Sequence, residues 1–175
     1  GACVEKKHLM DEMEAQNQRF KTLLHRILPV PVVKRLDEGE ELIADRFSST
    51  TILFSDLVGF THMSAQLSPS EVINILDEVF SAFDEIAEHF GVEKIKTIGD
   101  AYMAAGGLPI ARLDHADATV KMGIEMIKVL EKIRLRLQLP LLMRVGIHSG
   151  PVAAGIIGRN RFLYDVWGDT VNIAS

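Results

Sequence analysis

Residues 51–61 read TILFSDLVGFT, a short apolar stretch that ends in polar residues and a glycine. The β-branched and aromatic side chains up to Phe54 predict a strand that ends at Ser55 and Asp56. Gly59 then allows a close backbone approach before a helix, where amide groups can hold phosphate. The stretch lacks the Gly-Lys-Ser/Thr of a Walker motif, so by itself it indicates such a turn only weakly.

The clearest helix signal lies just downstream. Ser68-Pro69-Ser70-Glu71 is a capping box with proline at the first helical position, and Gly91 stands where a C-terminal cap belongs. Two strands, 92–98 and 101–105, follow and are joined tightly through Gly99-Asp100. The apolar face predicted for the helix comprises Val72, Leu76, Val79, Phe83, Ile86 and Phe90.

The remaining pattern continues this alternation. Asp114 can cap another helix, 141–148 and 152–157 predict a strand pair across Ser149-Gly150-Pro151, 164–167 predicts one more strand, and a helix starts at Thr170. The order predicts an α+β fold, a ferredoxin-like βαββαβ sheet with helices on one face. The apolar stripe predicted for the helix after Asp114 comprises Ala116, Val120, Ile124, Ile127 and Leu130.

The N-terminal segment predicts a helical stalk that runs to Leu28. Its apolar positions alternate by four and three residues, which fits either the seam of a coiled coil or an amphipathic helix packed on its own domain. Pro29 and Pro31 end this helix, and a short helix from Pro31 to Glu38 forms a neck. We therefore divide the chain into a stalk and neck (1–47) and a second domain (48–175). The seam positions are Leu9, Met13, Gln16, Phe20, Leu23 and Ile27.

Composition excludes several classes of protein. The 175 residues are 47% hydrophobic, which is enough for a sizeable core, and the net charge of −5 argues against a protein that wraps nucleic acid. A single cysteine, Cys3, excludes a disulfide framework and a thiolate zinc site, which fits a reducing cytosol. No run approaches the 18 apolar residues of a membrane span.

Two carboxylates are placed where they can meet. Asp56 ends the first predicted strand, and Asp100 lies in the tip of the following hairpin. Two carboxylates at one sheet edge suit Mg²⁺ or Mn²⁺ shared with a phosphate substrate. The alternatives are a helix N-cap before Leu57 for Asp56 and ordinary turn chemistry for Asp100.

Three further charged residues are candidates for binding. Lys96 lies on a strand, with Lys94 two residues earlier on the same predicted face and interpreted as solvated. Arg144 starts a strand segment where it can meet phosphate. Asp165 is flanked by aromatic and aliphatic residues, and a partly buried carboxylate requires a partner or a function.

Four motifs together resemble the successive signatures of the class III nucleotidyl cyclases. They are FSDLVGFT (54–61), EKIKTIGDAYM (93–103), RVGIHSG (144–150) and YDVWGDTVN (164–172). The resemblance covers about residues 20–175, including the neck.

The resemblance implies an adenylate cyclase that converts ATP to 3′,5′-cyclic AMP and pyrophosphate. It assigns two Mg²⁺ or Mn²⁺ ions per site to Asp56, Asp100 and the carbonyl of Leu57, and a ribose-positioning role to Asn172. Lys96 and Asp165 match the adenine-selecting pair, where guanylyl cyclases typically carry Glu and Cys. The other implied substrate contacts are Gly59, Phe60, Thr61, Arg144 and Val166.

The resemblance also implies an assembly. In the family the metal aspartates and the base-selecting pair of one site come from opposite subunits, and this chain carries both sets, so we expect a head-to-tail homodimer. Receptor-linked members suggest a sensor or membrane region upstream, hence a cytoplasmic domain, free or at the cytosolic face of a membrane-anchored protein. The family's transition-state arginine and a phosphate-binding lysine would follow Ser175, so we expect the catalytic domain to be C-terminally incomplete here and impaired as it stands.

Other functions remain open at this point. A non-catalytic cyclase-homology module, used for dimerisation or nucleotide sensing, is the alternative from a different class, although such modules usually lose a metal aspartate. A guanylate cyclase conflicts with Lys96 and Asp165. A diguanylate cyclase would need a Gly-Gly-Asp/Glu-Glu-Phe hairpin, where this chain has Ile98-Gly99-Asp100-Ala101.

Overall fold

The computed structural model describes residues 2–158 and 161–175. Two compact units form, one of residues 1–43 with 156–164 and one of residues 44–155 with 165–175. The first unit contains α1 (Ala2–Ile27) and α2 (Val30–Asp37), as the prolines predict. The apolar residues of the predicted α1 seam are all more than half exposed, so the coiled coil stays a prediction.

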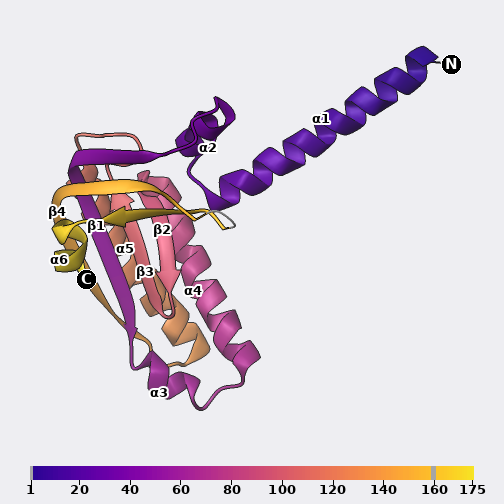
Figure 1. Ribbon diagram of the computed structural model, residues 1–175. Coiled ribbons are helices and arrows are strands. Elements are labelled where there is room, and N and C mark those ends of the chain that lie inside the picture. Colours follow the sequence, from indigo (N-terminus) through magenta and orange to yellow (C-terminus); the bar gives the residue numbers. More distant parts are fainter. Residues whose placement is uncertain (1, 159–160) are drawn as a thin grey trace. The chain divides into compact units, whose positions relative to one another are not determined.

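The second unit is built on an antiparallel sheet in the order β2-β3-β1-β4-β5. Read from β4, the first four strands have the order 4-1-3-2 of a ferredoxin-like fold, which confirms the predicted α+β class. Helices α4 and α5 lie together on one face of the sheet (Figure 1). The elements are β1 (Ala44–Val58), α3 (Phe60–Ser64), α4 (Pro69–Phe90), β2 (Glu93–Ile98), β3 (Ala101–Gly106), α5 (His115–Leu137), β4 (Leu142–Ile157), β5 (Leu163–Trp167) and α6 (Asp169–Ala174).

Helix α4 forms as its local signals predict. Ser68 and Glu71 make the reciprocal capping box, and Gly91 adopts the left-handed conformation at the C-cap. The fully buried stripe runs through Ile75, Val79, Phe83 and Ala87, so only two of the predicted apolar positions lie at its centre, and the other four are partly buried beside it.

Helix α5 exposes most of the stripe that the sequence predicted. Val120, Ile124 and Ile127 are 45–51% exposed, and only Leu130 of the predicted set is buried. Small residues explain the difference, because a Cβ built on Gly123 would lie 3.4 Å from side chains of the sheet, which lets the helix axis approach closely. The buried face of α5 comprises Ala118, Thr119, Met122, Gly123, Met126, Leu130 and Ile133.

Strand β4 corrects the predicted hairpin across residues 149–151. It is one continuous strand paired with β1 from end to end, and no turn forms there. The register of β1 shifts between Phe47 and Thr50, opposite Pro151, so the missing proline N–H falls where the ladder is already interrupted. A proline at a bulge therefore does not end the strand.

Strand β1 is much longer than residues 51–54. It extends from Ala44 to Val58, so the boundary that we placed between 47 and 48 falls inside it. Asp56 is consequently a strand residue and does not follow the strand. The N-cap alternative for Asp56 is wrong, because α3 is capped by Gly59.

Candidate active site

Strand β1 separates core residues from site residues by simple alternation. Leu53 and Leu57 point into the core with α4 and α5, whereas Phe54 and Asp56 point to the opposite face, called here the open face. Register places Asp56 between Ala101 of β3 and Arg144 of β4. The open face therefore receives side chains from three adjacent strands at the same level.

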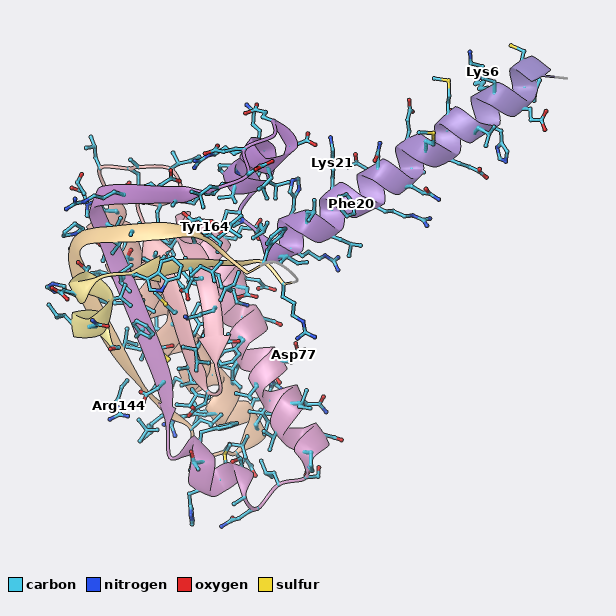
Figure 2. All side chains as sticks on the ribbon, viewed as in Figure 1. Lys6, Phe20, Lys21, Asp77, Arg144 and Tyr164 are labelled. Atoms are coloured by element: carbon cyan, nitrogen blue, oxygen red, sulfur yellow. The ribbon has the colours of Figure 1, made fainter. Side chains whose placement is uncertain are left out.

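A pocket of about 500 Å³ opens at this level. Arg144 donates from Nε to Asp56 Oδ1 over 3.0 Å and from Nη2 to Oδ2 over 2.5 Å. The Arg144 side chain is 75% exposed, and Figure 2 shows it on the outside of the sheet. Hydrogen bonding to Asp56 raises the pKa of this guanidinium, so Arg144 stays charged. The lining comprises Phe54, Ser55, Asp56, Ile98, Ala101, Arg144, Val145, Gly146, Ala174 and Ser175.

Asp100 lies beside Asp56, as the hairpin position predicts. It occupies the turn between β2 and β3 and directly precedes Ala101, the register partner of Asp56. Within residues 2–158 and 161–175, no group of three or more His, Cys, Asp or Glu side chains is arranged to hold a metal ion. The candidate donor set is thus two carboxylates and the Leu57 carbonyl, all oxygen, which fits a hard cation that retains waters and shares phosphate oxygens.

The predicted phosphate turn begins α3. Gly59 has φ +76° and caps the helix, and a Cβ built there would meet nothing within 4 Å. Phe60 is buried, which anchors the turn in the core, and Thr61 is exposed. The first amides of a helix have no acceptor within it, so those of Phe60 and Thr61, beside Gly59, are suited to an anion. Their contact with phosphate stays a prediction.

Lys96 and Asp165 meet on the open face. Lys96 Nζ donates to Asp165 Oδ2 over 2.6 Å, and the backbone N–H of Val166 donates to Oδ1 over 2.8 Å. The Asp165 side chain is 11% exposed, and that of Lys96 is 28% exposed. The Val166 side chain is buried, so this residue contributes its backbone amide to the site, where it orients Asp165.

Asn172 is carried by α6, which packs against the sheet. Its side chain is exposed, and Ala174 and Ser175 at the end of the helix line the pocket. Thr170 Oγ1 donates to the Pro151 carbonyl over 2.8 Å, and a Cβ on Gly146 would lie 2.1 Å from the Ala174 carbonyl. Gly146 and Thr170 thus seat α6, a role that sequence reasoning missed because it depends on the continuous course of β4.

Lys94 departs from the prediction that it shares a face with Lys96. It pairs with Ala104 of β3, on the helix-covered face, whereas Lys96 pairs with Met103 on the open face. A bulge between the two lysines breaks the two-residue alternation. Lys94 is not free in solvent, because its Nζ donates to Asp84 Oδ2 over 2.8 Å.

Comparison with known proteins decides the family. Residues 42–175, more than three quarters of the chain, match the family described as "Adenylate and Guanylate cyclase catalytic domain". The chain belongs to this family. It is therefore a cyclase catalytic domain, which agrees with the four motifs and with the fold.

Relatives of this cyclase domain include enzymes named for either nucleotide. An adenylate cyclase of Mycobacterium tuberculosis is 42% identical over 93% of the chain, and a membrane guanylyl cyclase of Dictyostelium discoideum is 42% identical over 92%. The chain spans 37% and 11% of these two proteins. Identity alone therefore does not choose between ATP and GTP.

A solved structure resembles the domain at comparable similarity. The catalytic core of a rhodopsin-guanylyl cyclase with converted specificity, in complex with ATPαS, has a TM-score of 0.71 at 37% identity. The likeness covers 75% of this chain and 71% of that one. Among the described residues, no helix of the cyclase domain or stalk is long and apolar enough to cross a membrane.

Proposed function

We propose that this cyclase domain uses ATP and forms 3′,5′-cyclic AMP and pyrophosphate. The observation that carries the proposal is the oriented pair of Lys96 and Asp165 on the open face. Both Asp165 oxygens already accept a hydrogen bond, so the carboxylate is fixed before any nucleotide arrives.

The chemistry of this pair favours adenine over guanine. Lys96 can donate to adenine N1, and Asp165 Oδ2 retains a lone pair for the 6-amino group. Guanine presents the opposite pattern, an O6 acceptor and an N1–H donor, and would leave the protein groups mispaired. A site built on such hydrogen bonds discriminates strongly, because a mispaired polar group loses its solvation without compensation.

The other end of the open face suits the triphosphate. Asp56, Asp100 and the Leu57 carbonyl would hold Mg²⁺ or Mn²⁺, which neutralises phosphate charge and polarises the reacting oxygens. Arg144 is 75% exposed, so a phosphate could reach its guanidinium and replace Asp56. Asn172 would position the ribose so that its 3′-oxygen attacks the α-phosphorus in line, releases its proton to solvent and displaces pyrophosphate.

We also propose that two copies form a head-to-tail dimer. The carboxylate pocket and the Lys96–Asp165 pair both belong to one chain, so a two-fold axis generates two equivalent sites. Each site would combine the pocket of one subunit with the purine-selecting pair of the other.

The test is cyclic AMP formation by the full-length protein supplied with Mn²⁺ and ATP. We expect product from the wild type, none above background from Asp56→Ala, and wild-type activity from Asp77→Ala, an exposed aspartate on α4 (Figure 2). A folded, dimeric wild type that makes no product would overturn the proposal in favour of a non-catalytic module.

A further inference from the structure

Strand β2 presents its two lysines to different sides of the sheet. Lys94 lies over the helix-covered face and Lys96 over the open face, because the register against β3 shifts between them. Strand β2 is the terminal strand in the sheet order, so β3 is its one neighbouring strand in the described sheet. A slip of one residue in such a strand moves every side chain to the opposite face.

Three residues on the helix-covered side support this register through side-chain contacts, in addition to the backbone hydrogen bonds of the strands. Asp84 of α4 accepts from Tyr102 Oη at Oδ1 over 2.7 Å and from Lys94 Nζ at Oδ2 over 2.8 Å. The Lys94 ammonium also lies 5.4 Å from the centre of the Tyr102 ring. Tyr102 is fully buried, so it fixes Asp84 to β3. We call Asp84, Lys94 and Tyr102 the β2 clamp.

We propose that the β2 clamp is a specificity-determining element that positions Lys96 for the purine. This inference rests on the proposed function, because it concerns the base-selecting pair of the same site. The clamp ties Lys94, which precedes the bulge, to α4. Lys96, which follows the bulge, then faces the open side of the sheet and contacts the carboxylate of Asp165. Its members touch no nucleotide and act through Lys96.

The exposure of Lys94 and Asp84 distinguishes a role in nucleotide selectivity from a role in the stability of the fold. The Lys94 and Asp84 side chains are 38% and 45% exposed, and ion pairs at such positions contribute little to folding. Loss of the Lys94 contact should therefore leave the fold intact while β2 moves relative to β3. The expected consequence is lost nucleotide selectivity without a matching loss of stability.

The kinetic experiment compares Lys94→Met with Lys94→Arg in the full-length protein. We expect Lys94→Met to lower the ratio of kcat/KM for ATP to that for GTP about fivefold, mainly through KM for ATP, because one hydrogen bond to the base is weakened. Lys94→Arg, which keeps the charge, should restore most of the ratio. Lys121→Met removes a more exposed ion pair on α5, with Asp117, and is the control.

A double-variant measurement tests whether the effect passes through Lys96. In a Lys96→Met background, Lys94→Met should change the ATP to GTP ratio no further. An unchanged ratio in the single variant, or an equal loss in both backgrounds, would overturn the clamp as a specificity element.

A measurement without nucleotide keeps this inference distinct from the proposed function. Amide hydrogen exchange should accelerate across β2 in Lys94→Met and stay at wild-type rates in Lys121→Met. Unchanged exchange in β2 would overturn the clamp even if the wild type is an active adenylate cyclase. Accelerated exchange in a protein that forms no cyclic nucleotide would support the clamp's hold on β2 and overturn its role in selectivity together with the proposed function.

Discussion

The two ion pairs of the open face differ in how firmly they are held. Arg144 and Asp56 are 75% and 37% exposed, and their guanidinium–carboxylate contact faces solvent. Lys96 and Asp165 are 28% and 11% exposed, and Asp165 is fixed further by the Val166 amide. We propose that the first pair exchanges partners when a triphosphate and a cation bind, whereas the second, already held in place, recognises the base.

Substitution of Asp56 and substitution of Arg144, the exposed pair, should lower catalytic activity to very different degrees. Asp56→Asn keeps the shape but removes the charge proposed to hold the cation, so kcat should fall about 10³-fold or more. Arg144→Gln should mainly raise KM for ATP, by about tenfold, because it removes one phosphate contact. Steady-state kinetics with Mn²⁺ and ATP measure both, and equal losses would mean that the ion pair itself is what activity needs.

Exchanging the preformed pair should alter selectivity and leave the chemistry intact. Lys96→Glu together with Asp165→Cys should lower the preference for ATP over GTP about 100-fold, because the donor and acceptor pattern offered to the purine changes. Competition assays with both nucleotides measure the ratio, and Lys121→Glu on α5 is the control. Unchanged selectivity in the double variant would show that these residues do not read the base.

A substitution outside both ion pairs should lower activity by moving α6. A Cβ in Gly146→Ala would lie 2.1 Å from the Ala174 carbonyl, so the helix that carries Asn172 must shift. We expect activity to fall about tenfold and stability by about 2 kcal/mol. Gly123→Ala, whose Cβ meets only side chains at 3.4 Å, is the matched control and should keep near wild-type values. Equal melting temperatures and catalytic rates in the wild type, Gly146→Ala and Gly123→Ala would show that the contact with Gly146 does not position α6.

The smallest effect concerns pH and Glu93, the first residue of β2. Burial raises the pKa of this carboxyl to about 7. The unfolded chain then loses the proton at lower pH than the folded one, so stability should fall as pH rises from 5 to 7 and level off above that range. The carboxyl keeps some contact with solvent, so we expect a loss of about 2 kcal/mol.

Urea unfolding across this pH range tests the effect. Glu93→Gln should flatten the curve, and Glu88→Gln on the exposed side of α4 should keep the wild-type profile. A wild-type stability that rises between pH 5 and 7 would contradict the burial of this group.

Short sequence motifs predicted the helices and hairpins that are determined by residues close together in the chain. The capping box at Ser68 and the glycine at 91 predicted α4 to the residue, and the Gly99-Asp100 turn predicted the β2–β3 hairpin. The fold class followed from the order of these elements, since helices and hairpins in that order permit few sheets.

Features that depend on distant residues could not be predicted. Gly150-Pro151 indicated a turn, and only the bulge in β1 about 100 residues earlier explains why β4 continues through it. Most of the buried face of α5 was missed because it includes small residues at 118, 119 and 123, which an apolar stripe of larger side chains does not reveal.

The candidate site was predictable as a set of residues but not as an arrangement. The motifs identified Asp56, Asp100, Lys96 and Asp165. In the structure Lys96 bonds to Asp165, and Asp100 directly precedes Ala101, the register partner of Asp56. The contact of Arg144 with Asp56 and the separation of Lys94 from Lys96 both follow from strand register, which no local pattern encodes.

The most direct test of the central claim is the product formed when the full-length protein receives equal concentrations of ATP and GTP with Mn²⁺. We expect cyclic AMP with little cyclic GMP, because Lys96 and Asp165 are held in the arrangement that we propose pairs with adenine. Cyclic GMP as the main product would show that Lys96 and Asp165 do not select adenine.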